Sequence, residues 1–244
     1  MDDLIERVAR KKAELDQLRA ASPRGLENFE RIYDLELTWS SNAIEGNTLT
    51  RSETMLVIEH GITIGGKPLK DHLEAIDHHE ALRYVRQIAG RGTPLTEMDV
   101  RTLHSLVVRR SAPDIAGQYA DQGRFVLTDA GPVAFPSPAE VPALMGDFAA
   151  WLRAAADTPR TAFEAHLRLV NIHPFNDGNG RTARLLMNLL LIRGLYPPVA
   201  VRPEDRVAYV GALQGQAGDA GEGFRRLMWG RLDETISELL MSQR

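Results

Sequence analysis

The twelve residues from 173 to 184, His-Pro-Phe-Asn-Asp-Gly-Asn-Gly-Arg-Thr-Ala-Arg, constrain the fold of this chain more than any other segment. A proline disfavours helical geometry in the residue before it, so the helix leading into this segment must end at His173. Gly178 and Gly180 permit a tight loop, after which a new helix begins near Arg181. The segment therefore predicts two helices joined by a short glycine loop, with an imidazole at the end of the first.

The side chains of this loop are typical of phosphate chemistry. Two glycines let backbone N–H groups converge, and the positive end of the following helix adds to an anion site. Arg181 and Arg184 share one face of that helix, where both can reach phosphate oxygens. Asp177 would repel a phosphate unless a cation bridges them, which indicates Mg²⁺, and His173 has the pKa range of a general base. The pattern therefore indicates phosphoryl or nucleotidyl transfer from a polyphosphate to a nucleophile.

Most of the remaining sequence is a series of helical segments, because apolar side chains recur at helical spacing over long stretches. A threonine followed three residues later by an acid marks a helix start at Thr50, Thr96 and Thr161. We expect helices at about 2–20, 26–44, 50–61, 70–89, 96–107, 161–173, 181–190, 204–214 and 222–240.

One stretch breaks this helical pattern. Between residues 116 and 142 the sequence is rich in glycine and proline, and the run from Arg124 to Thr128 favours a strand. This composition indicates a hairpin set among helices. The expected fold class is therefore mainly α, with one small β-hairpin.

Composition narrows both the chemistry and the partners. The 244 residues include no cysteine, which excludes thiol nucleophiles, disulfides and cysteine-ligated zinc. A net charge of −4 makes nucleic acid a poor default partner. The N-terminus lacks the apolar core of a signal peptide, and the apolar stretch at 185–192 is much shorter than the roughly 20 residues that cross a bilayer. We therefore expect a cytoplasmic protein with neither a nucleic-acid nor a membrane partner.

Two motifs resemble those of a known family. Residues 173–184 match the Fic-domain motif HPFx[D/E]GNGRxxR at every specified position. Upstream, Ser41-Asn-Ala-Ile-Glu45-Gly46 resembles the (S/T)xxxE(G/N) motif of the self-inhibiting helix found in many Fic proteins. The resemblance covers roughly residues 30 to 230 and implies the Fic fold, a helical core with a β-hairpin flap.

The resemblance also implies a domain organisation. It places an N-terminal helical extension at 1–38 and a Fic domain at 39–230. Within that domain the inhibitory helix would be 39–46 and the flap 124–137, and residues 231–244 would end the C-terminal helix.

Fic enzymes typically transfer AMP from ATP to a Ser, Thr or Tyr hydroxyl of a protein, and the resemblance implies the same activity here. By match, His173 would deprotonate the hydroxyl and Asp177 would hold Mg²⁺ between the α- and β-phosphates. Tyr209 and Gln216 would lie near the adenine. The full set implied for ATP is Asp177, Gly178, Asn179, Gly180, Arg181, Thr182, Arg184, Tyr209 and Gln216.

The inhibitory motif implies regulation. Ser41, Glu45 and Gly46 would form its functional part, and the Glu45 carboxylate would pair with Arg181 in place of the γ-phosphate. The flap would clamp the target chain as an added strand, so the expected partner is a protein hydroxyl docked there. Auto-modification and a homodimer are compatible with the resemblance.

Other functions stay open at this stage. In some relatives the same glutamate positions water to remove AMP, so a de-AMPylase is an alternative, as is another Fic-type nucleotidyl or phosphoryl transferase. Gly180 argues against a kinase-like relative, which carries lysine there. A regulatory binding module is less favoured because the charge is acidic. The family flap commonly follows Gly-x-Tyr-Arg, whereas here Ala120 follows Tyr119 and Arg124 comes later, so the flap register is open.

Overall fold

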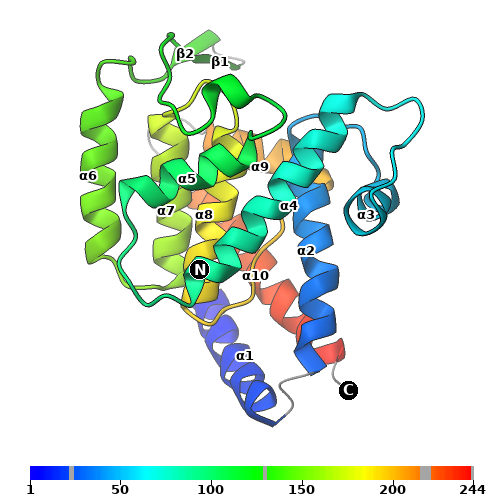
Figure 1. The fold of residues 1–244 in the computed structure, drawn as a ribbon. Helices are drawn as coiled ribbons and strands as arrows, with labels where there is room; N and C mark the ends of the chain where they lie inside the picture. Colours follow the sequence, from blue (N-terminus) through cyan, green and yellow to red (C-terminus); the bar gives the residue numbers. More distant parts are fainter. Residues whose placement is uncertain (22–24, 129–130, 215–220, 243–244) are drawn as a thin grey trace.

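The computed structural model describes residues 1–21, 25–128, 131–214 and 221–242. Figure 1 shows helices gathered around one central helix, with a two-stranded sheet at one end, which confirms the mainly α fold class. The α-helices in chain order are α1 (Asp2–Ala21), α2 (Gly25–Ile44), α3 (Arg51–His60), α4 (Leu69–Ala89), α5 (Glu97–Val107), α6 (Val141–Ala154), α7 (Pro159–Ile172), α8 (Asn179–Arg193), α9 (Arg206–Leu213) and α10 (Glu222–Ser242). Short 3-10 turns lie at Pro113–Ile115 and Pro203–Asp205, and the strands are β1 (Phe125–Thr128) and β2 (Gly131–Ala134).

Helix α8 forms the centre of the core. Every residue from 181 to 191 is buried, because α7, α4 and α5 pack around this helix. An apolar run such as Leu185-Leu-Met-Asn-Leu-Leu-Leu191 is stable only when it is covered on all sides. Side chains from several helices can therefore reach the N-terminus of α8, where the glycine loop lies.

The predicted helix starts have mixed outcomes. Thr50 and Thr96 form capping boxes with Glu53 and Asp99, as the sequence indicates. The start expected at Thr161 is wrong, because the Thr158 side chain caps α7 and Pro159 occupies its first turn. A proline is favoured there because the first helical residues need no N–H donor within the helix.

The junction between α7 and α8 confirms the expected stop. His173 caps the C-terminus of α7 in the left-handed region, with φ 49° and ψ 57°, and its N–H donates to the Leu169 carbonyl at 2.9 Å. The following proline prevents continuation of the helix. The imidazole is therefore fixed at a chain reversal, directly before the glycine loop.

The hairpin lies at one end of the helical bundle (Figure 1) and confirms the small β-hairpin expected between residues 116 and 142. Its antiparallel register pairs Phe125 with Ala134 and Val126 with Val133. Two apolar side chains on β1 and one on β2 face solvent, with Phe125 65%, Leu127 72% and Val133 51% exposed. The flap therefore offers an unpaired apolar surface beside the loop that follows α7.

The two ends of the chain pack together. Helix α1 lies along α10 (Figure 1), and Lys11 Nζ on α1 is 2.7 Å from Asp233 Oδ1 on α10. The expected domain boundaries, 38/39 and 230/231, fall inside the continuous helices α2 and α10. Among the described residues, no helix is long and apolar enough to cross a membrane.

Candidate active site

The N-terminus of α8 has the geometry of an anion site. Gly178 is its N-cap, with φ 76°, and a Cβ there would lie 3.0 Å from Val108 Cγ1. Glycine is therefore required on both conformational and steric grounds. The first N–H groups of an α-helix have no partner within the helix, so those of residues 179–181 are directed toward the space in front of α8.

Two side chains that the family match implies for ATP instead hold this loop in shape. Asn179 accepts from the Phe175 N–H at 3.0 Å and donates to the Phe175 carbonyl at 2.7 Å. Thr182 Oγ1 donates to the Gly178 carbonyl at 2.8 Å. Both side chains are buried, so these residues can offer a phosphate their backbone N–H groups rather than their side chains.

His104 on α5 supports the loop through a hydrogen bond and a ring contact. Its Nδ1 accepts from the Gly117 N–H at 3.0 Å, so Nε2 carries the proton and donates to the Asp177 carbonyl at 2.9 Å. Its ring stacks on Phe175 with centroids 3.7 Å apart. Burial lowers the pKa of His104 to about 4, which keeps this neutral tautomer at neutral pH. His104 thus joins the segment before the flap to the loop before α8.

His173 is prepared to accept a proton. Its Nδ1 lies 3.3 Å from the Val170 carbonyl, which can only accept, so Nδ1 carries the hydrogen and Nε2 is unprotonated. The ring stacks on Phe135, at the base of the flap, with centroids 3.8 Å apart. Burial lowers the pKa of His173 to about 4, the Val170 hydrogen bond opposes this shift, and the charge of Arg124 adds to it. The imidazole is therefore neutral at pH 7.

Arg184 makes an ion pair with Glu45, at 2.7 Å between Nη2 and Oε1. The guanidinium also donates to Ser41, through Nε to Oγ and through Nη2 to the carbonyl, each at 2.9 Å. The expected pairing of Glu45 with Arg181 is therefore wrong. The residue that follows α2 reaches Arg184, whereas Glu74 on α4 lies beside Arg181.

The Glu45 carboxylate lies directly over the anion site. A Cβ built on Gly180 would overlap Glu45 Oε1 and would lie 3.0 Å from Arg184 Nη1. Gly46, with φ 97°, makes the turn that follows α2 and allows the glutamate to reach this position. A negative group of this chain thus occupies the space in front of the α8 N-terminus.

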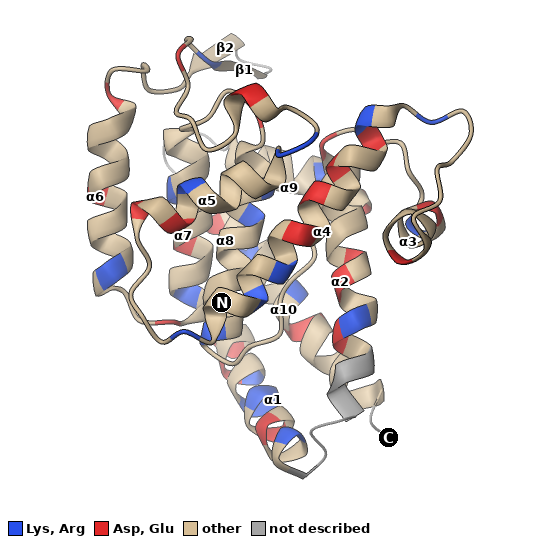
Figure 2. Cartoon of the chain, viewed as in Figure 1, with Lys and Arg blue, Asp and Glu red and all other residues tan. Residues whose placement is uncertain are grey.

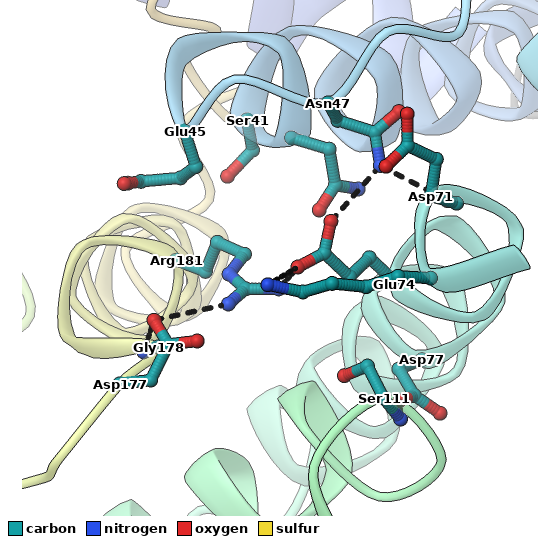
Figure 3. A network of polar contacts seen from close by, with 12 residues as sticks. Ser41, Glu45, Asn47, Asp71, Glu74, Asp77, Ser111, Asp177, Gly178 and Arg181 are labelled. Atoms are coloured by element: carbon teal, nitrogen blue, oxygen red, sulfur yellow. Dashed lines mark hydrogen bonds and ion pairs between the residues drawn. The ribbon is translucent and has the colours of Figure 1, made fainter. Parts of the chain in front are cut away.

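Arg181 has other carboxylates beside it. Its Nη1 lies 3.2 Å from Glu74 Oε1 on α4, and its Nη2 lies 3.4 Å from Asp177 Oδ1 (Figure 3). Its side chain is 3% exposed. Around the loop, the carboxylates of Glu45, Glu74 and Asp177 thus face two guanidinium groups.

Tyr209 lies in the site, with its hydroxyl turned into the core. The hydroxyl accepts from Arg184 Nη1 at 3.2 Å, so it donates to His166 Nε2 at 2.9 Å. Burial lowers the pKa of His166 well below its usual value, so His166 is neutral. The hydroxyl thus orients Arg184, while the ring forms part of the cleft wall. Gln216 lies outside the described residues.

A cleft of about 510 Å³ joins these parts. Its wall comes from the end of α2, the end of α7, the start of α8, the flap and α9. The lining includes Glu45, His173, Gly180, Arg184 and Tyr209. His173, the N-terminus of α8 and the flap therefore open into one space of a size that small-molecule sites commonly have.

Asp177 fits a magnesium site that substrate phosphates complete, rather than one formed by protein side chains alone. Its side chain is 52% exposed at the edge of the loop, and Oδ1 accepts from the Gly178 N–H at 2.6 Å. Among the described residues, no group of three acidic or histidine side chains could hold a metal ion by itself. Mg²⁺ commonly binds through one or two carboxylates together with substrate phosphates, so the residues present fit that mode.

The sequence motifs locate most of this site, and three supporting residues lie outside them. Glu74, His104 and His166 stand on α4, α5 and α7, and each contacts a residue of the loop or a partner of one. Their sequence positions give no signal beyond helical spacing, because each contact depends on how three helices pack.

Comparison with known proteins places the chain among related sequences. The Fic/DOC family model matches residues 94–191. The chain is 34% identical over 246 residues to a protein adenylyltransferase Fic from Nematostella vectensis, covering 98% of this chain and 56% of the relative. It is 33% identical to one from Culex quinquefasciatus, covering 86% of this chain and 42% of the relative. The chain thus spans about half the length of these two relatives.

Solved structures share the whole fold. A Fic-domain-containing signalling protein from Bacteroides thetaiotaomicron superposes with a TM-score of 0.88 at 30% identity, covering 97% of this chain and 96% of that one. Residues 134–508 of Fic-1 from C. elegans superpose with a TM-score of 0.85 at 29% identity, covering 99% of this chain and 71% of that one. The similarity therefore includes the helices on both sides of the motif loop.

Proposed function

The chain belongs to the Fic/DOC family, and we propose that it transfers AMP from ATP to a side-chain hydroxyl of a protein. The observation that carries this proposal is one cleft lined by a neutral His173, the Gly180 backbone and Arg184. A base beside an anion site is the arrangement that nucleotidyl transfer to a hydroxyl requires. Its relatives from Nematostella and Culex are named protein adenylyltransferases, which supports the same activity here.

His173 acts as the general base. Its unprotonated Nε2 removes the proton of the target hydroxyl while the hydroxyl oxygen attacks the α-phosphorus of ATP. The bond from the α-phosphorus to the β-phosphate oxygen breaks, and pyrophosphate leaves with its electron pair. The products are an AMP ester of the target and pyrophosphate, and the proton stays on His173.

The α8 N-terminus and its arginines bind the phosphates. Backbone N–H groups at residues 179–181 face the developing negative charge, and Arg181 and Arg184 neutralise the outer phosphates. Asp177 would hold Mg²⁺, which supplies charge neutralisation between the phosphates when it is bound. A bridging cation would relieve the repulsion between the Asp177 carboxylate and the phosphates.

Glu45 keeps this activity in check. Its carboxylate takes the Arg184 hydrogen bond that a terminal phosphate would use and covers Gly180. Phosphates that enter beside it are displaced from the position in line with the base. The inhibition therefore acts through Arg184.

The flap receives the target. Among the described residues β1 pairs only with β2, so its other edge can pair with an extended segment of another chain, and Phe125 and Leu127 are mostly exposed on this strand. Phe135 at its base stacks on His173, so a docked segment lies beside the base. The partner is a protein with a hydroxyl in an extended stretch.

Labelled ATP tests this function. The Glu45→Gly variant, supplied with Mg²⁺, should incorporate label from α-phosphate-labelled ATP into itself or into an added protein mixture. No label should enter from γ-phosphate-labelled ATP, and the Glu45→Gly, His173→Ala double variant should incorporate neither. Incorporation of the γ-label would replace AMP transfer by phosphoryl transfer, and incorporation of neither label by the Glu45→Gly variant would contradict the proposed function.

A further inference from the structure

Glu74 joins two parts of the active site that are far apart in sequence. It lies on α4 with its side chain 9% exposed. Its Oε1 is 3.2 Å from Arg181 Nη1, and its Oε2 accepts from Asn47 Nδ2 at 3.1 Å (Figure 3). One buried carboxylate thus contacts both a phosphate-binding arginine and the turn that follows Glu45.

We call this turn, residues 45–48, the inhibitory turn. The Asn47 N–H donates to the Asn42 carbonyl at 3.1 Å and closes the end of α2, while Asn47 Nδ2 also donates to the Asp71 carbonyl at 3.0 Å. Thr48 adds bonds from its N–H and hydroxyl to Asp71 Oδ2, at 2.8 and 2.6 Å. The inhibitory turn is therefore attached to α4 at two acidic residues, Asp71 and Glu74.

Among the acidic residues of α4, Glu74 pairs with Arg181 of the loop, whereas Asp77 and Glu80 pair with Arg110. Figure 2 shows the acidic residues of this helix before its arginines, which lie toward its C-terminal end. Within the described residues, Arg181 Nε and Nη1 make no hydrogen bond, although both are buried. The ion pair with Glu74 at 3.2 Å and the hydrogen-bonded ion pair with Asp177 at 3.4 Å therefore supply the charge compensation of Arg181.

We propose that Glu74 is a positioning residue that couples Arg181 to the inhibitory turn, and this proposal rests on the proposed function. Glu74 orients Arg181 through the ion pair and holds Asn47 through the hydrogen bond, so a shift of its side chain on phosphate binding at Arg181 also shifts the turn. Any change that weakens the hold on the turn favours the release of Glu45 from Arg184. By reciprocity, release of Glu45 makes Arg181 easier for a phosphate to reach.

This coupling gives Glu74 opposite effects in two backgrounds. With Glu45 present, removing the Glu74 charge loosens the inhibitory turn and raises AMP transfer. With Glu45 replaced by glycine no inhibition remains to be relieved, and the same change leaves Arg181 poorly oriented, so AMP transfer falls. A residue with a merely structural role would lower activity in both backgrounds.

Three matched variants separate the two contacts. Glu74→Gln weakens both the ion pair with Arg181 and the hydrogen bond with Asn47, and Asn47→Ala removes the hydrogen bond to the turn. Glu80→Gln makes the same chemical change on the same helix but at an ion pair with Arg110, away from the loop. Each variant is made in two backgrounds, one with Glu45 and one with Glu45→Gly. We measure the ATP-dependent incorporation of label, the KM for ATP and the melting temperature.

With Glu45 present, Glu74→Gln and Asn47→Ala should each raise AMP transfer about tenfold, the effect of a lost hydrogen bond to a charged group. In the Glu45→Gly background Glu74→Gln should lower kcat/KM about tenfold, mainly through KM for ATP, whereas Asn47→Ala should change it less than about twofold. Glu80→Gln should change neither. The coupling would be overturned if Glu74→Gln changed AMP transfer in the same direction in both backgrounds. It would also be overturned if Glu74→Gln had the same effect as Glu80→Gln.

Amide hydrogen exchange gives a readout that does not need catalysis. The amides of residues 45–49 should exchange faster in Glu74→Gln than in Glu80→Gln, and unchanged exchange would also overturn the coupling. If Glu74→Gln fails to fold, the two Asn47→Ala measurements decide alone. Failure of the proposed function is recognised separately, because the Glu45→Gly variant would then transfer no AMP although the turn still responds to Glu74→Gln.

Discussion

The loop at residues 173–184 and the flap at 125–134 share one cleft but are built in opposite ways. In the loop, the side chains of Asn179 and Thr182 make hydrogen bonds to the loop backbone, and His104 on α5 adds another. In the flap, most large apolar side chains face solvent. The comparison teaches that the end of the cleft proposed for ATP is rigid before anything binds, whereas the end proposed for the target is left open. Preorganised donors need no rearrangement during the reaction, and an open strand can accept different segments.

The largest expected effect comes from removing the imidazole of His173, at the start of the loop. In the Glu45→Gly background, His173→Ala should lower AMP transfer about 10²–10⁴-fold, the usual contribution of a general base. ATP affinity, measured by titration calorimetry, should stay within about threefold, because the anion site does not use the imidazole. Loss of ATP binding in this variant would show that His173 shapes the site rather than acting as its base.

The next effect tests the rigidity of the loop directly. Asn179→Ala leaves the buried N–H and C=O of Phe175 without partners, each at a cost of about 1–3 kcal/mol. We expect the free energy of unfolding to fall by about 2 kcal/mol or more, as measured by urea denaturation, together with a loss of AMP transfer.

Asn176→Ala is the matched control, because Asn176 lies in the same loop but is exposed and bonds Asp121 on the surface. Its effect on unfolding should stay below about 0.5 kcal/mol. Equal costs for the two substitutions would contradict a loop held together by Asn179.

The pH profile tests the electrostatics of the base. A base must be neutral, and burial, opposed by the Val170 hydrogen bond, lowers the pKa of His173 from 6.5 to about 4. In the Glu45→Gly variant, kcat/KM should therefore remain flat as the pH falls from 7.5 to about 5 and should decline only near 4. Loss of the Glu45 charge lowers this pKa further, so the sign of the expectation is unchanged. An acid limb centred near 6.5 in protein that is still folded would contradict it.

The smallest effect is expected on the open side of the cleft. Leu127→Ser removes an apolar side chain that is 72% exposed, so unfolding should change by less than about 0.5 kcal/mol. Leu185→Ala, in the fully buried part of α8, should lower the free energy of unfolding by about 2–5 kcal/mol. A large cost at Leu127, seen in the same denaturation assay, would mean that the flap is packed in solution.

The sequence predicts this molecule best where structure is local. The end of α7 at His173 and the reversal through Gly178 follow from single residues, so they could be placed without knowing the fold. The flap was predicted because glycine and proline punctuate a short β-favouring run. Helix α6 gave no clear signal, since Pro142 reads as a turn residue yet lies in its first turn.

The partner of Glu45 could not be found in this way. Arg181 and Arg184 are three residues apart on one helix, so their directions differ by about 60°. Which of them α2 reaches depends on how α2, α4 and α8 pack, and Glu74 on α4 already lies beside Arg181. The role of Tyr209 depends on packing as well, because its hydroxyl reaches Arg184 through the core.

Nucleotide affinity tests the central claim most directly, namely that the Glu45 carboxylate takes the place of a terminal phosphate at Arg184. Affinities for ATP, ADP and AMP with Mg²⁺ are measured by calorimetry in His173→Ala, with Glu45 present and with Glu45→Gly. Removal of Glu45 should tighten ATP binding at least about tenfold more than ADP or AMP binding, the effect of a charge-assisted hydrogen bond. Equal gains for all three nucleotides, or no gain for ATP, would contradict the account.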